Sequence, residues 1–378
     1  MIRTIRRIFI VCVVCTLTAL QVNVVLADNA PLGSPKKLAW VRARAEHGFI
    51  EQEIELAATY FAGRGVRQDF AQAAHWYEKA AKAGEPRAQN EIGYFYQAGI
   101  GVPVDLTQAA HWYQLAAASG LVQGSVNLGV LYLTGSGVEK NPSTAITLFT
   151  KAFEHGCGTG ASYLGEMYLY GMGVAKDEAV AESWYEAGLK LHDPVAAYRL
   201  GLLYSVDENH PRDLSKAVKF LRTATEGGYV PAMHALGYQL VRNPELANSP
   251  KEARSLLEKA AESGVWRSSM LLGILARDGA EGKPDDETAY YYYQIAMRQG
   301  GPEAQRLIVH DIKVLEGKLP TERRANLDSS ADAWFAQHHL DLLLIHKDPS
   351  SYRYFPSVAV AVAPSGSYVG QLVPLTVN

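Results

Sequence analysis

An aspartate column recurs along the chain, and carboxylates in series are residue types that metal sites and acid–base catalysts use. The interval is thirty-six residues, and an alanine follows four positions after each member. That spacing places each residue at the start of a helix, where its side chain accepts hydrogen bonds from free backbone amides. We therefore interpret the column as helix N-caps and predict no metal there. Its members are Asp69, Asp105, Asn141, Asp177, Asp213, Ser249 and Asp285.

Histidines offer a second possible chemistry, which is metal binding. His75 and His111 share a column, but its other members are Thr, Ser, Lys, Ser and Tyr, the composition of a solvated face. His338 and His339 are adjacent, so they point to different sides of a helix and form no i, i+4 ligand pair. No G-x-S-x-G, HExxH or phosphate-loop motif is present. The sequence predicts no catalytic residues, no metal and no cofactor.

The same interval governs the residues that must build the fold. Small residues let helices approach closely, and bulky pairs such as Trp76-Tyr77 fill the core beside them. Glycines such as Gly63 end the first helix of each unit in a left-handed conformation, which Asp207 and Asn243 also tolerate. A period of this size predicts an all-α, right-handed solenoid of two-helix units. The small columns are Gly93, Gly129, Gly165, Gly201, Gly237, Gly273 and Ala73, Ala109, Ala145, Ala181, Ala217, Ala253, Ala289.

The chain resembles the Sel1-like repeat family, the thirty-six-residue relatives of tetratricopeptide repeats. The resemblance rests on LG-x-x-Y segments such as Leu128–Tyr132, on G-x-G-V turns such as Gly63–Val66, and on A-x-x-W-Y-x-x-A segments. It covers about Glu51 to Gly300 and implies an adaptor for protein partners. One subgroup that has been linked to β-lactam binding or hydrolysis carries a cysteine pair in each repeat, and those cysteines are missing here.

The N-terminal segment reads as an export signal. Arg3, Arg6 and Arg7 precede the apolar run Ile8–Leu20, and small residues precede Asp28, so residues 1–27 fit a signal peptide. An uncleaved membrane anchor is the alternative, although the run is short for a span. We expect a periplasmic or secreted protein with no stable membrane insertion after cleavage.

Composition limits the partners. Lys and Arg number 36 against 39 Asp and Glu, a formal net charge of −3 without a basic stripe, so no nucleic-acid partner is expected. Of the three cysteines, Cys12 and Cys15 lie in the signal segment, which leaves Cys157 unable to form an intramolecular disulfide. Beyond the signal we expect a capping helix in 28–50, seven repeats in 51–300, a degenerate eighth repeat with a second capping helix in 301–346, and a β-prone or disordered tail in 347–378.

The positions that the fold leaves free indicate a binding surface. In each first helix, positions equivalent to 90, 94 and 97 share one face and vary between units. First helices line the concave side of a solenoid, so this face suits an extended peptide or a partner helix. The alternative is that some of these side chains pack between neighbouring repeats. The predicted groove residues are Tyr94, Val130, Glu166, Tyr198, Leu202, His234, Tyr238 and Ile274.

These observations predict an exported, non-enzymatic scaffold that binds an unidentified protein or peptide through the concave groove. The alternative is an envelope hydrolase acting on β-lactams or peptidoglycan. That activity would require a nucleophile with a nearby base, and the sequence shows no such pair.

Overall fold

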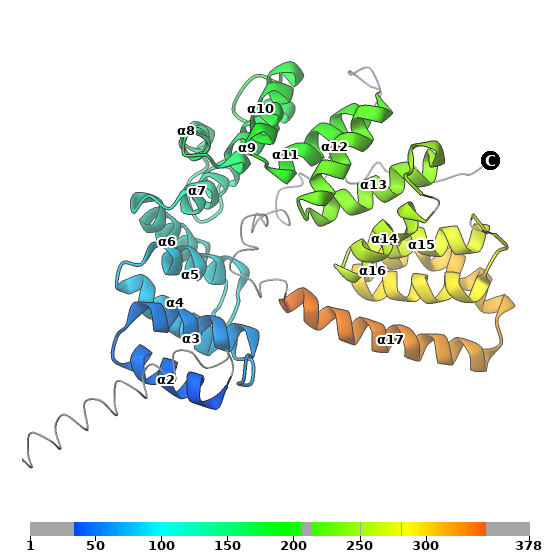
Figure 1. Ribbon diagram of the computed structural model, residues 1–378, viewed down its shortest axis with the longest axis horizontal. Coiled ribbons are helices and arrows are strands. Elements are labelled where there is room, and N and C mark those ends of the chain that lie inside the picture. The colour runs from blue at the N-terminus through cyan, green and yellow to red at the C-terminus, as the bar shows by residue number, and fades with distance from the viewer. Residues whose placement is uncertain (1–33, 206–212, 250, 281, 345–378) are drawn as a thin grey trace, which may run out of the picture. The chain divides into compact units, whose positions relative to one another are not determined.

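The computed structural model describes residues 34–205, 213–249, 251–280 and 282–344, with side chains as far as His338 (Figure 1). All regular elements in these ranges are helices. The expected signal segment 1–27 and the tail 347–378 lie outside the described residues. The chain divides into two compact units, one reaching Leu148 and the other starting at Phe149, and each is described by itself.

In the first unit, each helix contacts the next one along the chain from α2 to α7. The lone helix expected before the first repeat is α2, and the following helices form the predicted pairs. The division between the units falls within α8. The helices are α2 (Pro35–Glu46), α3 (Ile50–Ala62), α4 (Phe70–Lys82), α5 (Pro86–Ala98), α6 (Leu106–Ala118), α7 (Val122–Thr134) and α8 (Pro142–Glu154).

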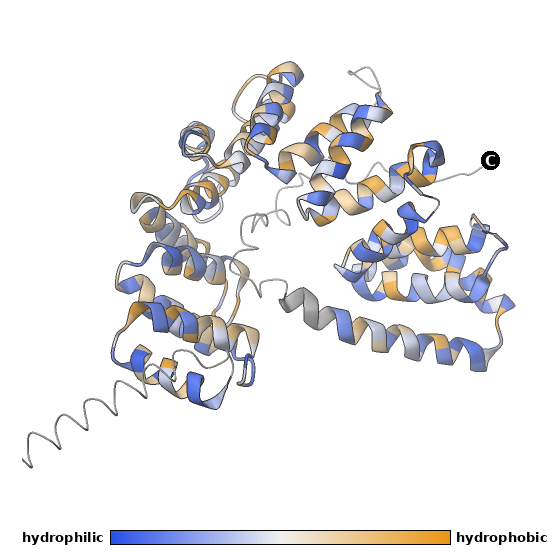
Figure 2. Cartoon of the chain, viewed as in Figure 1, coloured by the Kyte–Doolittle hydropathy of each residue, from blue (hydrophilic) through white to orange (hydrophobic). Residues whose placement is uncertain are grey.

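The second unit continues the pairs, and most helices in Figure 2 carry both hydrophobic and hydrophilic stretches. The first helices of successive repeats also contact one another, α9 with α11, α11 with α13 and α13 with α15. They therefore form one continuous side of the unit. The elements are α9 (Gly158–Tyr170), α10 (Glu178–Lys190), α11 (Pro194–Ser205), α12 (Leu214–Glu226), α13 (Val230–Arg242), the 3₁₀ turn η1 (Pro244–Leu246), α14 (Glu252–Glu262), α15 (Trp266–Asp278), α16 (Asp286–Lys318) and α17 (Thr321–Leu344).

The aspartate column caps helices, as predicted. Asp105 Oδ1 accepts hydrogen bonds from the amides of Thr107 and Gln108, both at 3.0 Å. The same geometry recurs at Asp69, Asn141, Asp177, Asp213 and Asp285. The prediction is wrong at Ser249, because α14 starts only at Glu252 and its N-cap residue, Lys251, makes no side-chain cap.

The turn in the same repeat explains that exception. The glycines of the turn column, Gly63, Gly99, Gly135, Gly171 and Gly279, are left-handed as predicted, with φ between 65° and 74°. Asn243 is not, since its φ is −135°. Pro244 follows it, and a residue before proline is driven toward extended conformations. The chain then forms η1 and starts α14 late, so this repeat has an irregular connection.

The Leu-Gly column makes room for a side chain. A Cβ atom at Gly165 would lie 2.5 Å from Cε1 of Tyr185, which is fully buried and stands twenty residues later. The same relation joins Gly93 to Tyr113 and Gly273 to Tyr293. The backbones also approach closely in this column, as expected, since the Ala109 carbonyl oxygen would lie 3.4 Å from a Cβ at Gly93. The nearest atoms in each of these three cases, however, belong to the ring.

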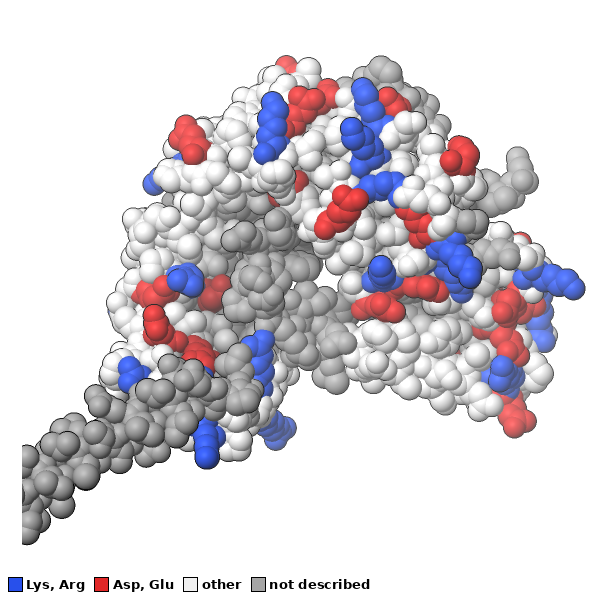
Figure 3. Space-filling model, in the orientation of Figure 1, with Lys and Arg blue, Asp and Glu red and all other residues white. Residues whose placement is uncertain are grey.

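The C-terminal end of the second unit is a half-repeat closed by α17. Helix α16 is kinked at Gly301, with φ 54° and ψ −138°, and Pro302 begins its second segment. Ion pairs join neighbouring helices, or the two segments of α16, here, and Figure 3 shows basic and acidic side chains next to one another over α14 to α16. The pairs are Arg267–Glu303, Arg277–Asp311, Arg298–Asp332, Lys318–Asp286 and Arg323–Glu287.

Candidate interaction surface

The first helices of the second unit are linked through buried polar side chains. The Ser162 hydroxyl on α9 donates to Oδ2 of Asp193 at 2.6 Å, and Asp193 immediately precedes α11. Asp193 is only 4% exposed. Burial raises the pKa of its carboxyl, although hydrogen bonds from Ser162 and from the amides of Val195 and Ala196 act in the opposite direction. This contact fixes the start of α11 against α9.

An ion pair between Glu166 on α9 and Arg199 on α11 lies along the same face. Burial disfavours the charged guanidinium, but the Glu166 carboxylate and the surrounding tyrosines together outweigh it and raise the pKa of Arg199. Arg199 also lies over the ring of Tyr198, 5.6 Å from its centre, and Tyr198 packs on Tyr229 with ring centres 5.1 Å apart. The result is a cluster of charge and aromatic surface from two successive repeats, in which half-buried Arg199 and Tyr198 lie beside buried Tyr229.

His234 continues this face on α13. Its Nδ1 atom lies 2.8 Å from the hydroxyl of Ser268 on α15, and Ser268 is fully buried. Burial lowers the pKa of His234 to about 4, with a further contribution from the positive charge of Arg267. The imidazole is therefore neutral at physiological pH. The His234 side chain links α13 to α15 by a hydrogen bond, just as the Ser162 side chain links α9 to the start of α11.

The first unit has a comparable polar cluster on α5 and α7. Asn127 Nδ2 donates to Asn90 Oδ1 at 2.8 Å, and Asn90 Nδ2 lies 3.4 Å from Oε1 of Glu91. Burial raises the pKa of Glu91 to about 7, even though the hydrogen bond from Asn90 lowers it. The Glu91 charge and burial also raise the pKa of Tyr94. This cluster joins two repeats in the same way as the pairs in the second unit.

The predicted groove residues fall into two classes. Val130 is 1% exposed and Tyr238 is 9% exposed, so both are packed inside their units. The Tyr238 hydroxyl also accepts a hydrogen bond from Nη1 of Arg242 at 3.3 Å. The remaining predicted positions, Tyr94, Glu166, Tyr198, Leu202, His234 and Ile274, are half-buried. Several of them bond to the next repeat, as the packing alternative stated.

Sequence reasoning missed the residues that complete these clusters. Glu91, Asn127, Tyr163 and Arg199 occupy the column next to the predicted one, and Asp193 precedes a helix. Residue types in this column vary between repeats as much as those in the predicted columns do, and that variation could have identified the column from the sequence. The predicted groove was drawn only from positions equivalent to 90, 94 and 97, so this column was left out.

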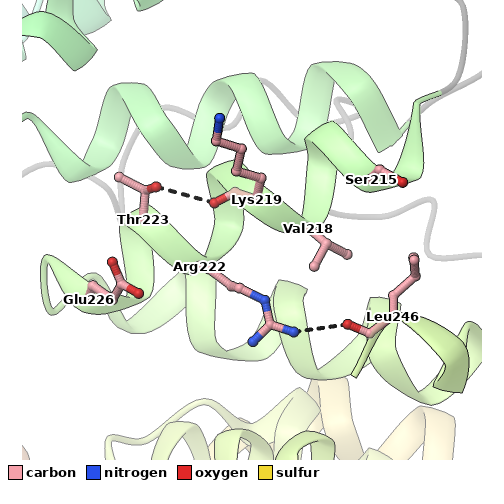
Figure 4. A pocket seen from close by; sticks show the side chains of 7 residues that line it. All are labelled: Ser215, Val218, Lys219, Arg222, Thr223, Glu226 and Leu246. Atoms are coloured by element: carbon pink, nitrogen blue, oxygen red, sulfur yellow. Dashed lines mark hydrogen bonds between the residues drawn. The ribbon is translucent and has the colours of Figure 1, made fainter. Parts of the chain in front are cut away.

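A hollow of about 370 Å³ lies along α12 (Figure 4). Leu246 of η1 lies on one side of it. Arg222 points toward η1, where its Nη2 atom donates to the Leu246 carbonyl at 2.9 Å, and it also pairs with Glu252. The polar groups of the hollow are thus partly occupied by one another. The lining residues are Ser215, Val218, Lys219, Arg222, Thr223, Glu226 and Leu246.

No arrangement for catalysis emerges among the described residues. Ser162 and Asp193 come nearest to a nucleophile beside a base, but they are 2% and 4% exposed, so a substrate does not reach them. Burial raises the pKa of the Cys157 thiol, which disfavours the reactive thiolate. The described part of the chain also contains no group of three or more potential metal ligands. None of its helices is long and apolar enough to cross a bilayer.

The match between a family model and the repeats identifies the family. The Sel1 repeat model matches seven successive segments, which together span more than half of the chain. This chain belongs to the Sel1 repeat family. Sel1 repeat proteins typically serve as protein-interaction scaffolds and are generally non-enzymatic. The matched segments are 53–85, 86–121, 123–157, 159–193, 194–229, 230–265 and 267–301.

Solved structures of Sel1 repeat proteins are similar to this chain. A Sel1 repeat protein from Oxalobacter formigenes is 27% identical, with 66% of this chain and 99% of that chain covered and a TM-score of 0.55. The protein c5321 of uropathogenic Escherichia coli, a protective antigen with an SLR fold, is 23% identical over 82% of this chain and 74% of its own, with a TM-score of 0.41. The immunity protein Pa5087 of Pseudomonas aeruginosa is 20% identical over 72% and 85%, with a TM-score of 0.39. None of the curated proteins matches the chain.

Proposed function

We propose that this Sel1 repeat protein is an exported, non-enzymatic scaffold that binds a protein or peptide through its first helices. The observation that carries the proposal is the continuous side formed by α9, α11, α13 and α15. Half-buried Tyr198, Leu202, His234 and Ile274 lie on these helices and differ in chemistry from one repeat to the next. A surface that changes along its length can distinguish one extended partner from another.

The polar links between repeats support this role. Ser162–Asp193, Glu166–Arg199 and His234–Ser268 each tie one first helix to the next. Such links hold the exposed parts of the surface in one arrangement before a partner arrives, which reduces the entropy lost on binding. Tyr238 was one of the predicted groove residues, but its burial makes it a stabilising residue. We now assign the anchoring role to Tyr198, Leu202 and Ile274.

Site-specific photo-crosslinking tests the proposal. A benzophenone amino acid is placed at Leu202 or Ile274 in the full chain, and Lys219, which is exposed on α12, serves as the control position. We expect discrete crosslinked products from Leu202 and Ile274 and none from Lys219. Equal crosslinking from all three positions, or products from Lys219 alone, would contradict the proposed surface.

Export rests on residues 1–27 and has its own test. The basic region, the apolar run and the small residues before Asp28 support cleavage after Ala27. N-terminal sequencing of the protein recovered from its cells should begin at Asp28. A mature chain that begins at Met1 would refute this part of the proposal without affecting the binding surface.

A further inference from the structure

We infer that the second segment of α16 is a docking site for an acidic amphipathic helix of a partner protein. The inference rests on the proposed scaffold function and extends it to the C-terminal end of the repeats. We use the term edge face for the side of residues 302–318 formed by Arg306, Leu307, Val309, His310, Lys313 and Val314, all of which are exposed. At about 100° per residue, these six residues span about 160° of the helix circumference.

The edge face concentrates exposed apolar surface. Leu307 is 59% exposed, Val314 is 48% exposed and Val309 is 40% exposed. These are three of the seven large hydrophobic residues exposed in the described chain, and they lie within eight residues of one another. Scattered exposed hydrophobic residues need no explanation, whereas a cluster of this kind marks an interaction site.

The repeat pattern explains why this surface is open. Leu271 occupies the position of Leu307 one repeat earlier and is only 3% exposed. Leu271 lies on α15, against which α16 packs, and we attribute the burial of Leu271 to this packing. After α16 the chain forms α17, which closes the half-repeat in the way that a second helix does, and no further first helix is present in the described residues. Among the described residues, Leu307 therefore occupies the column of a buried leucine without a following first helix to cover it.

The charge of the edge face is positive. Arg306, His310 and Lys313 occupy the same columns as Tyr198, Leu202 and Ser205 of α11, so the edge face continues the proposed binding side. Arg306 and Lys313 form no ion pair among the described residues. Three acids lie beside them. Glu303 pairs with Arg267 at 2.7 Å and Asp311 pairs with Arg277 at 2.9 Å, while Glu316 is half-buried and its charge contributes to the raised pKa of Tyr290. Around the segment, Arg306 and Lys313 lie in the middle of the edge face, with Leu307 and Val314 along one border and Val309 along the other. An acidic partner would thus meet unpaired cations beside an apolar border.

This combination selects one occupant. A helix with apolar residues at i, i+3 or i+4 and i+7 would place them against Leu307 and Val314, which are seven residues and about 20° apart on the segment. Glu or Asp on the adjoining flank of that helix would pair with Arg306 and Lys313. A second copy joined face to face would bring like charges together, which is unfavourable. The chain's own segment 349–378 contains no Asp or Glu, so it lacks the complementary charge.

Fluorescence anisotropy with defined peptides tests the inference on the full mature chain. The probe is a labelled amphipathic peptide of about 18 residues, long enough to follow the segment at about 1.5 Å per residue, built from Leu, Glu and Ala. The comparison peptide has the same composition in scrambled order. We expect the amphipathic peptide to bind at least about tenfold more tightly than the scrambled one, with weaker binding at high salt because the charges are screened.

Matched variants locate the binding. Leu307→Glu and the double variant Arg306→Glu/Lys313→Glu should each weaken amphipathic-peptide binding at least about tenfold. Leu191→Glu and Lys219→Glu alter exposed residues outside the edge face and should leave the affinity within about twofold. Circular dichroism and melting curves accompany all variants. Because the altered residues are exposed, each variant should retain its helical content.

Three results would overturn the inference: equal affinity for the two peptides, equal losses in the control variants, or no loss in Leu307→Glu. Vesicles of phosphatidylglycerol and phosphatidylcholine provide a further arm. Binding to the anionic vesicles that Leu307→Glu abolishes, together with no preference between the peptides, would assign the edge face to a lipid surface instead. Crosslinking from Leu202 would be unaffected by any of these outcomes, so the proposed function is judged separately.

Discussion

Gly165→Ala is expected to destabilise the second unit, although alanine is the better helix former. Gly165 lies inside α9, and replacing a helical glycine with alanine gains about 1 kcal/mol of intrinsic propensity. The new Cβ atom would lie 2.5, 2.7 and 2.9 Å from three atoms of the Tyr185 ring. Ordinary carbon contacts are about 3.5–4.0 Å, so a fully buried ring must move by about 1 Å.

The sign of the effect follows from comparing the two contributions. Overpacking a well-packed core costs about 1–3 kcal/mol. Set against the propensity gain of about 1 kcal/mol, the net change ranges from about zero to a loss of about 2 kcal/mol. Gly317→Ala is the matched control, because Gly317 lies in α16 and a Cβ there meets nothing within 4 Å. That substitution should stabilise the protein, by up to about 1 kcal/mol.

Urea unfolding followed by circular dichroism measures both changes as shifts of the transition midpoint. A double-mutant cycle with Tyr185→Ala isolates the contact, since removing the ring should turn the Gly165→Ala change into a gain. A rise in the midpoint for Gly165→Ala equal to that for Gly317→Ala would refute the argument. A Gly165→Ala loss that persists in the Tyr185→Ala background would also refute it.

Three further predictions concern capping, packing and pH. Asp105→Ala should cost about 1 kcal/mol in urea unfolding, because two amides of α6 lose their acceptor; an unchanged midpoint would contradict the capping role. Ala145→Asp should destabilise several times more than Asp105→Ala, since Ala145 is fully buried and a charge there has no solvent; parental stability would contradict that packing. Glu91 has a folded-state pKa of about 7 and an ordinary value of 4.5, so the unfolded chain loses this proton first as the pH rises. Stability should therefore fall between about pH 4.5 and pH 7 in the parent and fall less in Glu91→Gln, as thermal melts across that range would show.

Much of the fold was predictable because each local structural feature, such as a helix cap or a turn, recurs in several repeats with the same residue type. Asp105 recurs at helix starts, and Gly99 recurs at turns that need a left-handed residue. A single such residue is a weak signal, whereas the same residue type at a fixed interval is a strong one. The prediction failed at Ser249 and Asn243, where Pro244 changes the local conformation and the column no longer controls the turn.

The interaction surface was less predictable. Tyr238 and Val130 vary as a binding column would, yet both are buried. Variation shows only that no single residue type is required, and a side chain that packs against a varying neighbour varies with it. Arg199 and Asp193 were missed for the same reason, because their partners Glu166 and Ser162 lie one repeat away. The packing of neighbouring first helices determines which side chains contact each other across that distance.

The sequence by itself determined the period, the helices, their caps and the family, since these depend on contacts within one or two turns of the chain and on their repetition. The tertiary structure decided which side chains are covered. Leu271 and Leu307 are the same residue in the same column, yet one is 3% and the other 59% exposed, and among the described residues only the repeat of Leu271 is followed by a further first helix. The exposure of a residue depends on the neighbours that it contacts after folding, so it cannot be predicted from the sequence of its own repeat.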